Sequence, residues 1–573
     1  MYPERETAAT GDAGPNDRTE ATLRRTMPTA VITDIPRPRV TITPLTTVTV
    51  PLGYGGKNAN SLSVYLRADD RAWQAVIVRR PNVLLITLDQ FRGDSLSTMG
   101  HPVVRTPHLD ELARHGVHFR RHYTQSTPCS PGRAGLYTGM YQMNHRVVAN
   151  GTPLDRRFDN VALLARRAGY QPTLFGYTDQ SIDPRVSSGP DDPRLSSYEG
   201  LLPGFDWEMD MSGPHQPWVD FLASRGHDVS GGHLHLLATE HERPVDVSVS
   251  AYTTDRLIAW LRDREHGEPW FAHASYLRPH PPYSAAGEYA SMYDPAEVGL
   301  PISPVDARHP FHDLLLSLEG VAAPTDETAI RHLRAQYFGM ITAVDSEMGR
   351  LWQALRDTNA WDDTIIVLTT DHGEQLGDHG VLQKLAWFEE SHHIPLIWRD
   401  PRRAAGHGRV VDNFTESVDV LPTLAEAWGQ PVPRQCDGLP LTAFLDGVEP
   451  PRWRDAASWE FDWRYALIPL NDNPWPWDRR LEECNLAVHR TRDTAYVQFG
   501  DGSHLCFDIA ADPTWRTPVD DPERTLDMAQ RMLTWRSRHL DRTHTGLLVQ
   551  DGGVGIWPPG VEWSEARKDG SVS

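Results

Sequence analysis

The residues with the clearest chemical potential stand in the run Cys129-Ser130-Pro131-Gly132-Arg133. Proline is favoured in the first turn of a helix, and a helix N-terminus attracts anions. This run therefore predicts a thiol at a helix N-terminus, with an arginine one turn further on. The alternative is a buried structural cysteine in a turn, and residues elsewhere in the chain decide between the two.

Acidic residues end two apolar runs that are far apart in the sequence: Asp89 and Gln90 follow the first run, and Asp371 and His372 follow the second. Open α/β sheets bind ligands at the carboxyl ends of their strands, so neighbouring strands would bring these residues together. Carboxylate and amide oxygens suit Ca²⁺, Mg²⁺ or Mn²⁺, whereas an imidazole favours Mn²⁺ or another transition ion. An aspartate at a strand end is, taken singly, more often a turn or helix-cap residue, but both together with Cys129 predict a metal and anion site.

The elements that must position these residues follow from hydrophobic patterning. Strands and helices alternate through the middle of the chain, which predicts an α/β fold with a large, mainly parallel sheet sandwiched by helices. The predicted strands span 82–88, 173–177, 270–277, 364–370 and 394–398. The predicted helices span 106–116, 161–169, 250–264, 326–358 (one long helix or a bent pair) and 417–428, and a long insertion covers the region from 180 to 244.

The chain divides into four predicted regions. Residues 1–80 form an N-terminal arm with a small β extension, because period-two runs occur near 40–50, 62–66 and 73–78. Residues 81–450 form the catalytic α/β domain. Residues 451–545 form an α+β subdomain with a four-stranded antiparallel sheet and a helix over 522–540, and residues 546–573 form a tail.

Composition excludes several classes of function. With 56 Lys and Arg against 77 Asp and Glu, the formal net charge of -21 argues against a nucleic-acid surface. Four scattered cysteines form no disulfide framework and no zinc pattern, and they indicate a reducing compartment. No apolar signal core occurs in the first thirty residues and no 18-residue apolar run follows. The sequence therefore predicts a cytoplasmic protein without a membrane segment.

Five motifs, in order, resemble the formylglycine-dependent sulfatases of the alkaline phosphatase superfamily, most closely the branch of phosphonate monoester hydrolases and related arylsulfatases. The similarity spans residues 81–545 approximately and implies an alkaline-phosphatase-like fold. The motifs are Leu88-Asp89-Gln90, Cys129 to Arg133, Asn150-Gly151-Thr152-Pro153-Leu154-Asp155, Arg278-Pro279-His280-Pro281-Pro282, and Asp371-His372-Gly373-Glu374-Gln375-Leu376-Gly377-Asp378-His379.

The resemblance implies a specific mechanism. Cys129 would be oxidised by a formylglycine-generating enzyme to formylglycine (3-oxoalanine), whose hydrate attacks sulfur or phosphorus beside one divalent metal, Mn²⁺ or Ca²⁺. Arg133 would hold the formylglycine oxygen and neutralise charge. His280 or Lys384 would protonate the leaving alcohol. The implied metal ligands are Asp89, Gln90, Asp371, His372 and Cys129, and the implied substrate contacts are Asn150, Tyr177, Asp179, His379, His280 and Lys384.

Alternatives remain for several of these side chains. His280 lies between prolines and is also explained as a packed loop histidine, and Lys384 as a solvated lysine. His379 fits a supporting role in the metal loop as well as a base. Asp179 stands where a phosphonate hydrolase is expected to have a hydroxyl residue. A carboxylate there would disfavour dianionic phosphate monoesters while tolerating singly charged sulfate and phosphonate esters.

The sequence therefore predicts an enzyme of the arylsulfatase type that hydrolyses sulfate monoesters and also accepts phosphonate monoesters and phosphodiesters. The first alternative is a phosphonate monoester hydrolase or phosphodiesterase as the native activity. The others are a phosphatase or phosphodiesterase that uses unmodified Cys129 as a thiolate, and a non-enzymatic binding or scaffolding protein on a decayed hydrolase core. The expected partners are the small ester substrate, the modifying enzyme and further copies of the chain in a dimer or tetramer, with no nucleic acid and no membrane.

Overall fold

The computed structural model describes residues 80–264, 267–306, 308–464 and 481–540, and five short strands outside these ranges. Three of these strands form an antiparallel sheet in the order β1-β2-β3, within a separate compact unit that ends at Arg79. The other two, β17 and β18, pair with each other. The N-terminal arm and most of the tail lie outside the described residues. The strands are β1 (Thr46–Thr49), β2 (Ser63–Asp69), β3 (Ala72–Ile77), β17 (Leu548–Val549) and β18 (Gly555–Ile556).

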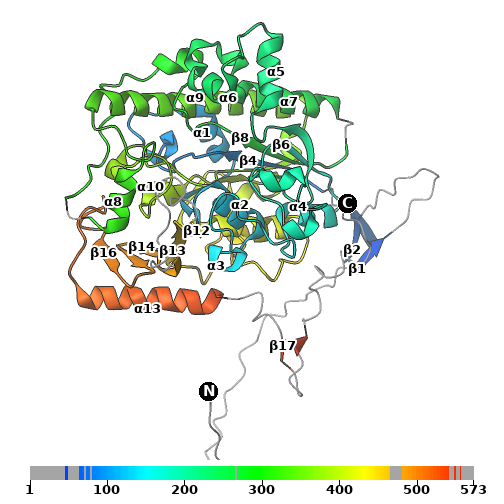
Figure 1. Cartoon of the computed structure of the whole chain (residues 1–573). Coiled ribbons are helices and arrows are strands. Elements are labelled where there is room, and N and C mark those ends of the chain that lie inside the picture. Colours follow the sequence, from blue (N-terminus) through cyan, green and yellow to red (C-terminus); the bar gives the residue numbers. More distant parts are fainter. Residues whose placement is uncertain are drawn as a thin grey trace, which may run out of the picture. The chain divides into compact units, whose positions relative to one another are not determined.

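A nine-stranded mixed sheet organises the second unit, which begins at Arg80 (Figure 1). Eight strands lie in the order β10-β5-β11-β9-β4-β8-β6-β7, and β12 pairs with β5. The strands from β9 to β7 are parallel, as is the β5–β12 pair, whereas β10 and β11 run antiparallel to their neighbours. The strands are β4 (Asn82–Leu88), β5 (Val117–Tyr123), β6 (Pro172–Gly176), β7 (Asp206–Asp210), β8 (Phe271–Tyr276), β9 (Thr364–Thr369), β10 (His393–Ile394), β11 (Ile397–Arg399) and β12 (Arg409–Glu416).

Helices cover both faces of this sheet because its central strands are apolar on both faces. In β4, Leu84, Ile86 and Leu88 pack in one core with α1, α7 and α9, whereas Val83 and Leu85 pack in the other with α2, α4 and α11. Figure 1 shows α7 and α9 on one side of the sheet and α2 and α4 on the other. These helices are α1 (Pro107–Arg114), α2 (Cys129–Thr138), α4 (Val161–Arg167), α7 (Val249–Asp263), α9 (Glu327–Asp357) and α11 (Val420–Ala427).

A four-stranded antiparallel sheet in the order β13-β14-β15-β16 follows the large sheet, and α13 packs on it through Met528, Met532 and Trp535. Its first strand also reaches the nucleophile region, because the Glu460 amide donates to the Gln125 carbonyl at 2.9 Å, four residues before Cys129. This subdomain therefore supports the segment that carries Cys129. Its elements are β13 (Ala456–Asp462), β14 (Asn485–Thr491), β15 (Thr494–Phe499), β16 (His504–Asp508) and α13 (Pro522–His539).

The remaining helices are short and belong to connections. Two of them lie in the predicted insertion between β6 and α7, together with β7. No helix among the described residues is both long and apolar enough to cross a membrane. The short helices are α3 (Gln142–His145), α5 (Gln216–Ser224), α6 (Gly232–Ala238), α8 (Pro310–Ser317), α10 (Glu389–His392) and α12 (Thr442–Leu445).

The predicted fold class is confirmed: a mainly parallel sheet sandwiched by helices is accompanied by a smaller antiparallel sheet with one helix. Where the sequence left open one long helix or a bent pair, α9 is a single helix of 31 residues. Strands β5 and β12 had no counterpart among the predicted elements.

Candidate active site

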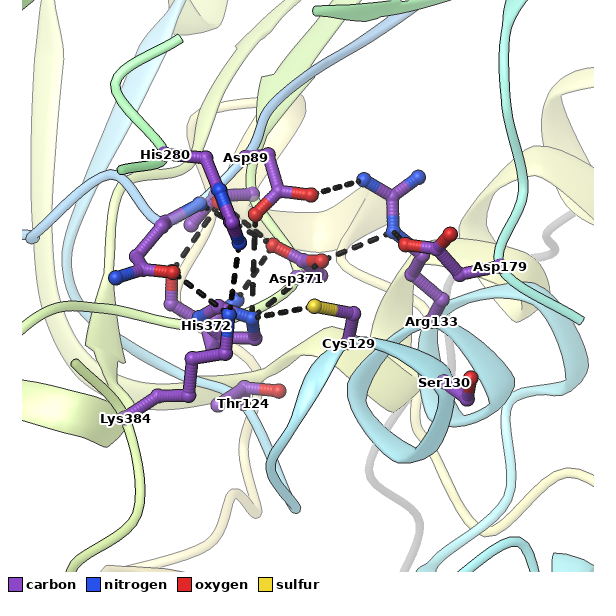
Figure 2. A network of polar contacts seen from close by, with 12 residues as sticks. Asp89, Thr124, Cys129, Ser130, Arg133, Asp179, His280, Asp371, His372 and Lys384 are labelled. Carbon is purple, nitrogen blue, oxygen red and sulfur yellow. Dashed lines mark hydrogen bonds and ion pairs between the residues drawn. The ribbon is translucent and has the colours of Figure 1, made fainter. Parts of the chain in front are cut away.

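Four parallel strands deliver the predicted site residues to one edge of the large sheet. Asp89 follows β4, Asp371 follows β9, His280 follows β8, and Asp179 follows β6. Cys129 begins α2, at the helix N-terminus that the sequence predicted. Residues from five distant segments therefore converge, as expected for the carboxyl end of an open α/β sheet (Figure 2).

The close approach of α2 to this edge requires a glycine in the cysteine motif. A Cβ atom on Gly132 would lie 2.5 Å from the backbone oxygen of Asp371, which is too close for any other residue without movement of the backbone. Gly132 therefore lets the first turn of α2 rest directly on the end of β9. As a result, the Cys129 sulfur lies 3.3 Å from Nε2 of His372.

Arg133 is fully buried and is the centre of the polar network. Its Nε donates to Oδ2 of Asp371 at 2.9 Å and its Nη2 donates to Oδ2 of Asp89 at 2.9 Å. Its Nη1 donates to Oγ of Ser275 at 2.8 Å and to the carbonyl oxygen of Tyr177 at 3.2 Å. A planar guanidinium can satisfy several acceptors at once, so Arg133 fixes the rotamers of both carboxylates.

Four of the predicted metal ligands form a compact group. One donor atom each from Asp89, Cys129, Asp371 and His372 lies within 4.8 Å of the others, and all four residues are buried. Donor atoms that bind one ion at roughly 2.0–2.4 Å lie no more than about 4.8 Å apart. The spacing therefore matches a single divalent ion.

Two further observations show that this group fits a metal. Oδ1 of Asp89 is buried without a hydrogen-bond partner, whereas Oδ2 of the same carboxylate accepts from Arg133 and from the Tyr177 hydroxyl. Nδ1 of His372 donates to the carbonyl oxygen of Gly373 at 3.1 Å, so the lone pair of Nε2 points toward Cys129. One carboxylate oxygen and one imidazole nitrogen are thus left for a cation, each oriented by a second hydrogen bond.

Burial and neighbouring charges shift the pKa values of this group. Burial raises the pKa of Asp89, and Asp371 adds to this effect while Arg133 opposes it. Burial would also raise the pKa of Asp371, but His372 and Arg133 outweigh it and hold that pKa below its ordinary value. Burial lowers the pKa of His372 to about 4, which keeps its imidazole in the neutral form that binds metals.

Gln90 lies at the site, but both ends of its side-chain amide are engaged. Its Oε1 accepts from Nζ of Lys384 at 2.8 Å, and its Nε2 donates to the buried carboxylate of Glu374. The oxygen that was predicted to bind the metal is therefore turned toward the lysine. Gln90 connects two residues of the site in this structure, and its predicted ligation stays a prediction.

Lys384 and His280 form a pair, with Nζ of Lys384 3.0 Å from Nε2 of His280. Burial would lower the pKa of Lys384, but Cys129, Asp89 and Asp371 outweigh it and raise the pKa. Burial and the neighbouring lysine lower the pKa of His280 well below its ordinary value. The site therefore presents a charged ammonium beside a neutral imidazole.

The predicted substrate-binding residues lie in different places: some are beside Arg133, and others support neighbouring segments. Tyr177 and Asp179 lie at Arg133, with Oδ2 of Asp179 3.3 Å from the guanidinium Nε and the guanidinium 4.6 Å from the Tyr177 ring centroid. Oδ1 of Asn150 accepts from the backbone nitrogen of Ser130 at 2.9 Å, so this side chain fixes the first turn of α2.

His379 is placed differently from the other predicted contacts. Its ring stacks on Phe388 with centroids 3.5 Å apart, and its Nε2 lies 3.8 Å from a carboxylate oxygen of Glu390. None of its contacts among the described residues is with Cys129 or Arg133. The structure thus gives His379 a packing role in the loop after β9, and its predicted role in substrate binding stays a prediction.

Sequence reasoning assigned no role to Ser275 or Glu374, although both take part in the network. Ser275, at the end of β8, accepts a hydrogen bond from Arg133, and no sequence signal marks it. Glu374 accepts a hydrogen bond from Gln90. The sequence did mark Glu374, because it lies three residues after Asp371 within the longest of the five motifs.

Comparison with known proteins identifies the family. The family model described as Sulfatase matches residues 81–430. The multifunctional alkaline phosphatase superfamily protein PehA of Trinickia caryophylli is 36% identical over 506 residues, which cover 81% of this chain and 97% of PehA. The chain therefore belongs to the sulfatase family. This confirms the family predicted from the sequence motifs.

Two further relatives show how broad the similarity is. The choline-sulfatase of Rhizobium meliloti is 29% identical to this sulfatase-family protein, covering 83% of this chain and 90% of the relative. The crystal structure of the phosphonate monoester hydrolase of Agrobacterium radiobacter has a TM-score of 0.77 and 40% identity, covering 84% of this chain and 100% of that chain. The protein is accordingly a hydrolase that acts on sulfuric or phosphonate esters.

Proposed function

We propose that this sulfatase-family protein hydrolyses singly charged esters, with aryl sulfate monoesters as its main substrates and phosphonate monoesters and phosphodiesters as further ones. The observation that carries this proposal is the convergence of Asp89, Asp371 and His372 on Cys129, with Arg133 holding both carboxylates. Such a group combines a nucleophile position, a cation site and a charge-neutralising guanidinium in one buried space.

Each residue has a defined task in this proposal. Residue 129, converted from cysteine to formylglycine, supplies the attacking oxygen of its hydrate. Asp89, Asp371, His372 and residue 129 would hold a divalent ion. When bound, such an ion acts as a Lewis acid that lowers the pKa of a neighbouring hydroxyl group. Arg133 keeps the carboxylates oriented and offsets their charge.

The pair of Lys384 and His280 serves the leaving group. The ammonium of Lys384 can donate a proton to the departing alcohol directly or by way of Nε2 of His280, which lies 3.0 Å from it. Positioned proton transfer of this kind typically contributes about 10²–10⁴-fold to a rate. The effect is largest for alcohols that leave poorly.

The second candidate is phosphonate monoester hydrolysis as the native activity. It is supported by the 40% identity to a crystal structure described as a phosphonate monoester hydrolase, compared with 29% identity to the choline-sulfatase. A side-by-side measurement of kcat/KM on 4-nitrophenyl sulfate and on a 4-nitrophenyl phosphonate monoester decides between the two. A value higher for the sulfate is expected, and a preference of several orders of magnitude for the phosphonate would reverse the assignment.

Asp179 is proposed to limit the charge that the substrate may carry. Its carboxylate is buried with Oδ2 3.3 Å from Nε of Arg133; burial raises its pKa, and the guanidinium opposes that rise and favours the charged form. A dianionic phosphate monoester would therefore meet a like charge or require Asp179 to take up a proton. Replacing Asp179 by asparagine is expected to raise kcat/KM for 4-nitrophenyl phosphate by about tenfold relative to the aryl sulfate.

The matched control for this measurement is Asp191→Asn, which removes a carboxylate from an exposed position in the neighbouring insertion. That variant is expected to leave the ratio of phosphate to sulfate hydrolysis unchanged. If Asp179→Asn also leaves the ratio unchanged, Asp179 does not set the charge preference.

A further inference from the structure

Glu374 is a fully buried carboxylate in the loop that joins β9 to Lys384. Its Oε1 accepts from the backbone nitrogens of Leu376 and Gln383, each at 2.7 Å, and Oε2 accepts from the side chain of Gln90. These three donor residues all have positive φ angles, of 53° for Leu376, 64° for Gln383 and 66° for Gln90. Non-glycine residues rarely adopt such angles, and they persist where surrounding contacts hold them. Glu374 is therefore the common contact of three strained positions around the site.

The carboxylate also determines which way the Gln90 amide faces. A glutamine amide has one accepting and one donating end, and both oxygens of Glu374 act as acceptors in this structure. Gln90 must therefore direct its NH₂ group to Glu374 and its oxygen to the opposite side. That oxygen accepts from Nζ of Lys384 at 2.8 Å.

The chain of hydrogen bonds extends from Lys384 to His280. Nδ1 of His280 lies 2.7 Å from the carbonyl oxygen of Pro281, and because a carbonyl only accepts, Nδ1 carries the proton. Nε2 is then an acceptor, and Nζ of Lys384 lies 3.0 Å from it. Lys384 thus donates to two acceptors, Gln90 and His280, whose orientations are each set by a neighbour.

We propose that Glu374 is a positioning residue for the proton donor of the reaction: it fixes the polarity of the Gln90 amide and thereby holds the Lys384 ammonium against Nε2 of His280. Glu374 acts through Gln90 and does not contact the reacting atoms. This inference rests on the proposed function, in which Lys384 and His280 protonate the leaving alcohol. It also gives a reason for an amide side chain directly after Asp89: Gln90 connects the acceptor Glu374 to the donor Lys384.

The single variant Glu374→Gln is the first test of the proposal. In Glu374→Gln, the new NH₂ group faces the NH₂ group of Gln90, so Gln90 must turn over and present a donor to the Lys384 ammonium. We expect kcat per bound metal ion to fall by about 10–100-fold, with the metal content of each variant measured alongside. The loss should grow as the pKa of the leaving alcohol rises, because less proton donation penalises poor leaving groups most.

The double variant Gln90→Glu with Glu374→Gln restores every donor and acceptor in the opposite arrangement. The amide introduced at position 374 then donates to the carboxylate introduced at position 90, whose second oxygen accepts from Lys384. We expect the double variant to recover kcat to within about fivefold of the wild type, whereas Gln90→Glu alone places two carboxylates against each other and is impaired. The control is Glu347→Gln, a buried glutamate on α9 that pairs with Arg350, and it should retain kcat within about twofold.

Wild-type-like kcat in Glu374→Gln, or a double variant no more active than the single ones, would overturn the proposal. Crystal structures of the two variants give a readout that does not depend on turnover. Nζ of Lys384 should leave its position beside His280 in Glu374→Gln and return in the double variant. If the wild type hydrolyses neither class of ester, the proposed function fails, and the crystallographic comparison still decides whether Glu374 positions Lys384.

Discussion

Replacing Cys129 by alanine is expected to lower kcat for either ester class by at least about 10⁴-fold, because the substitution removes the atom from which the nucleophile is made. The Cys129 sulfur lies 3.3 Å from Nε2 of His372, within the candidate metal group. The matched control is Cys506→Ala, which changes a buried thiol on β16 and should leave kcat nearly unaffected.

Mass spectrometry of the wild-type peptide spanning 121–140 tests whether Cys129 is converted to formylglycine. Conversion of cysteine to formylglycine lowers the peptide mass by about 18 Da, whereas an unmodified thiolate enzyme would retain the cysteine mass. An active preparation in which all of Cys129 is unmodified contradicts the formylglycine mechanism, and full turnover in Cys129→Ala contradicts covalent catalysis by residue 129.

Replacing Arg133 by alanine is expected to lower kcat/KM by about 10³-fold and to weaken metal binding by about 10–100-fold. Arg133 donates hydrogen bonds to one oxygen of Asp89 and to one oxygen of Asp371. Without these hydrogen bonds, both carboxylates are free to rotate away from the cation site. The metal-free protein should also lose about 3–5 kcal/mol of stability, because two buried carboxylates lose their counter-charge. Metal titration and thermal unfolding after chelation measure these two effects.

Arg454→Ala provides the matched control, since Arg454 also pairs with two buried carboxylates, those of Glu416 and Asp419, but in a different part of the fold. It should destabilise the protein by a similar amount while the metal affinity of the remaining folded protein stays unchanged. Equal loss of metal affinity in both variants would mean that Arg133 acts through general stability and not through the orientation of the ligands.

Much of the fold could be predicted because the central strands are continuous apolar runs. Strands β4 and β9 are buried on both faces, so their residues and their acidic ends were recognisable without a structure. Strand β5 was missed because it carries two arginines and two histidines among seven residues, and its burial depends on β10, β11 and β12 from the far end of the domain. A sequence pattern records side-chain polarity but does not record which distant strand will cover it.

The sequence by itself determined the family, the α/β fold and the identity of the cysteine, carboxylates and histidine that meet at the sheet edge, because strand ends and a specific motif mark them locally. The tertiary structure decided how these side chains are oriented. Gln90 turns to Lys384 and Glu374, which lie 294 and 284 positions away, and His379 turns onto Phe388 from a left-handed backbone conformation. Orientation depends on hydrogen-bond partners and packing contacts that are brought together only by folding, so residue type and spacing do not specify it.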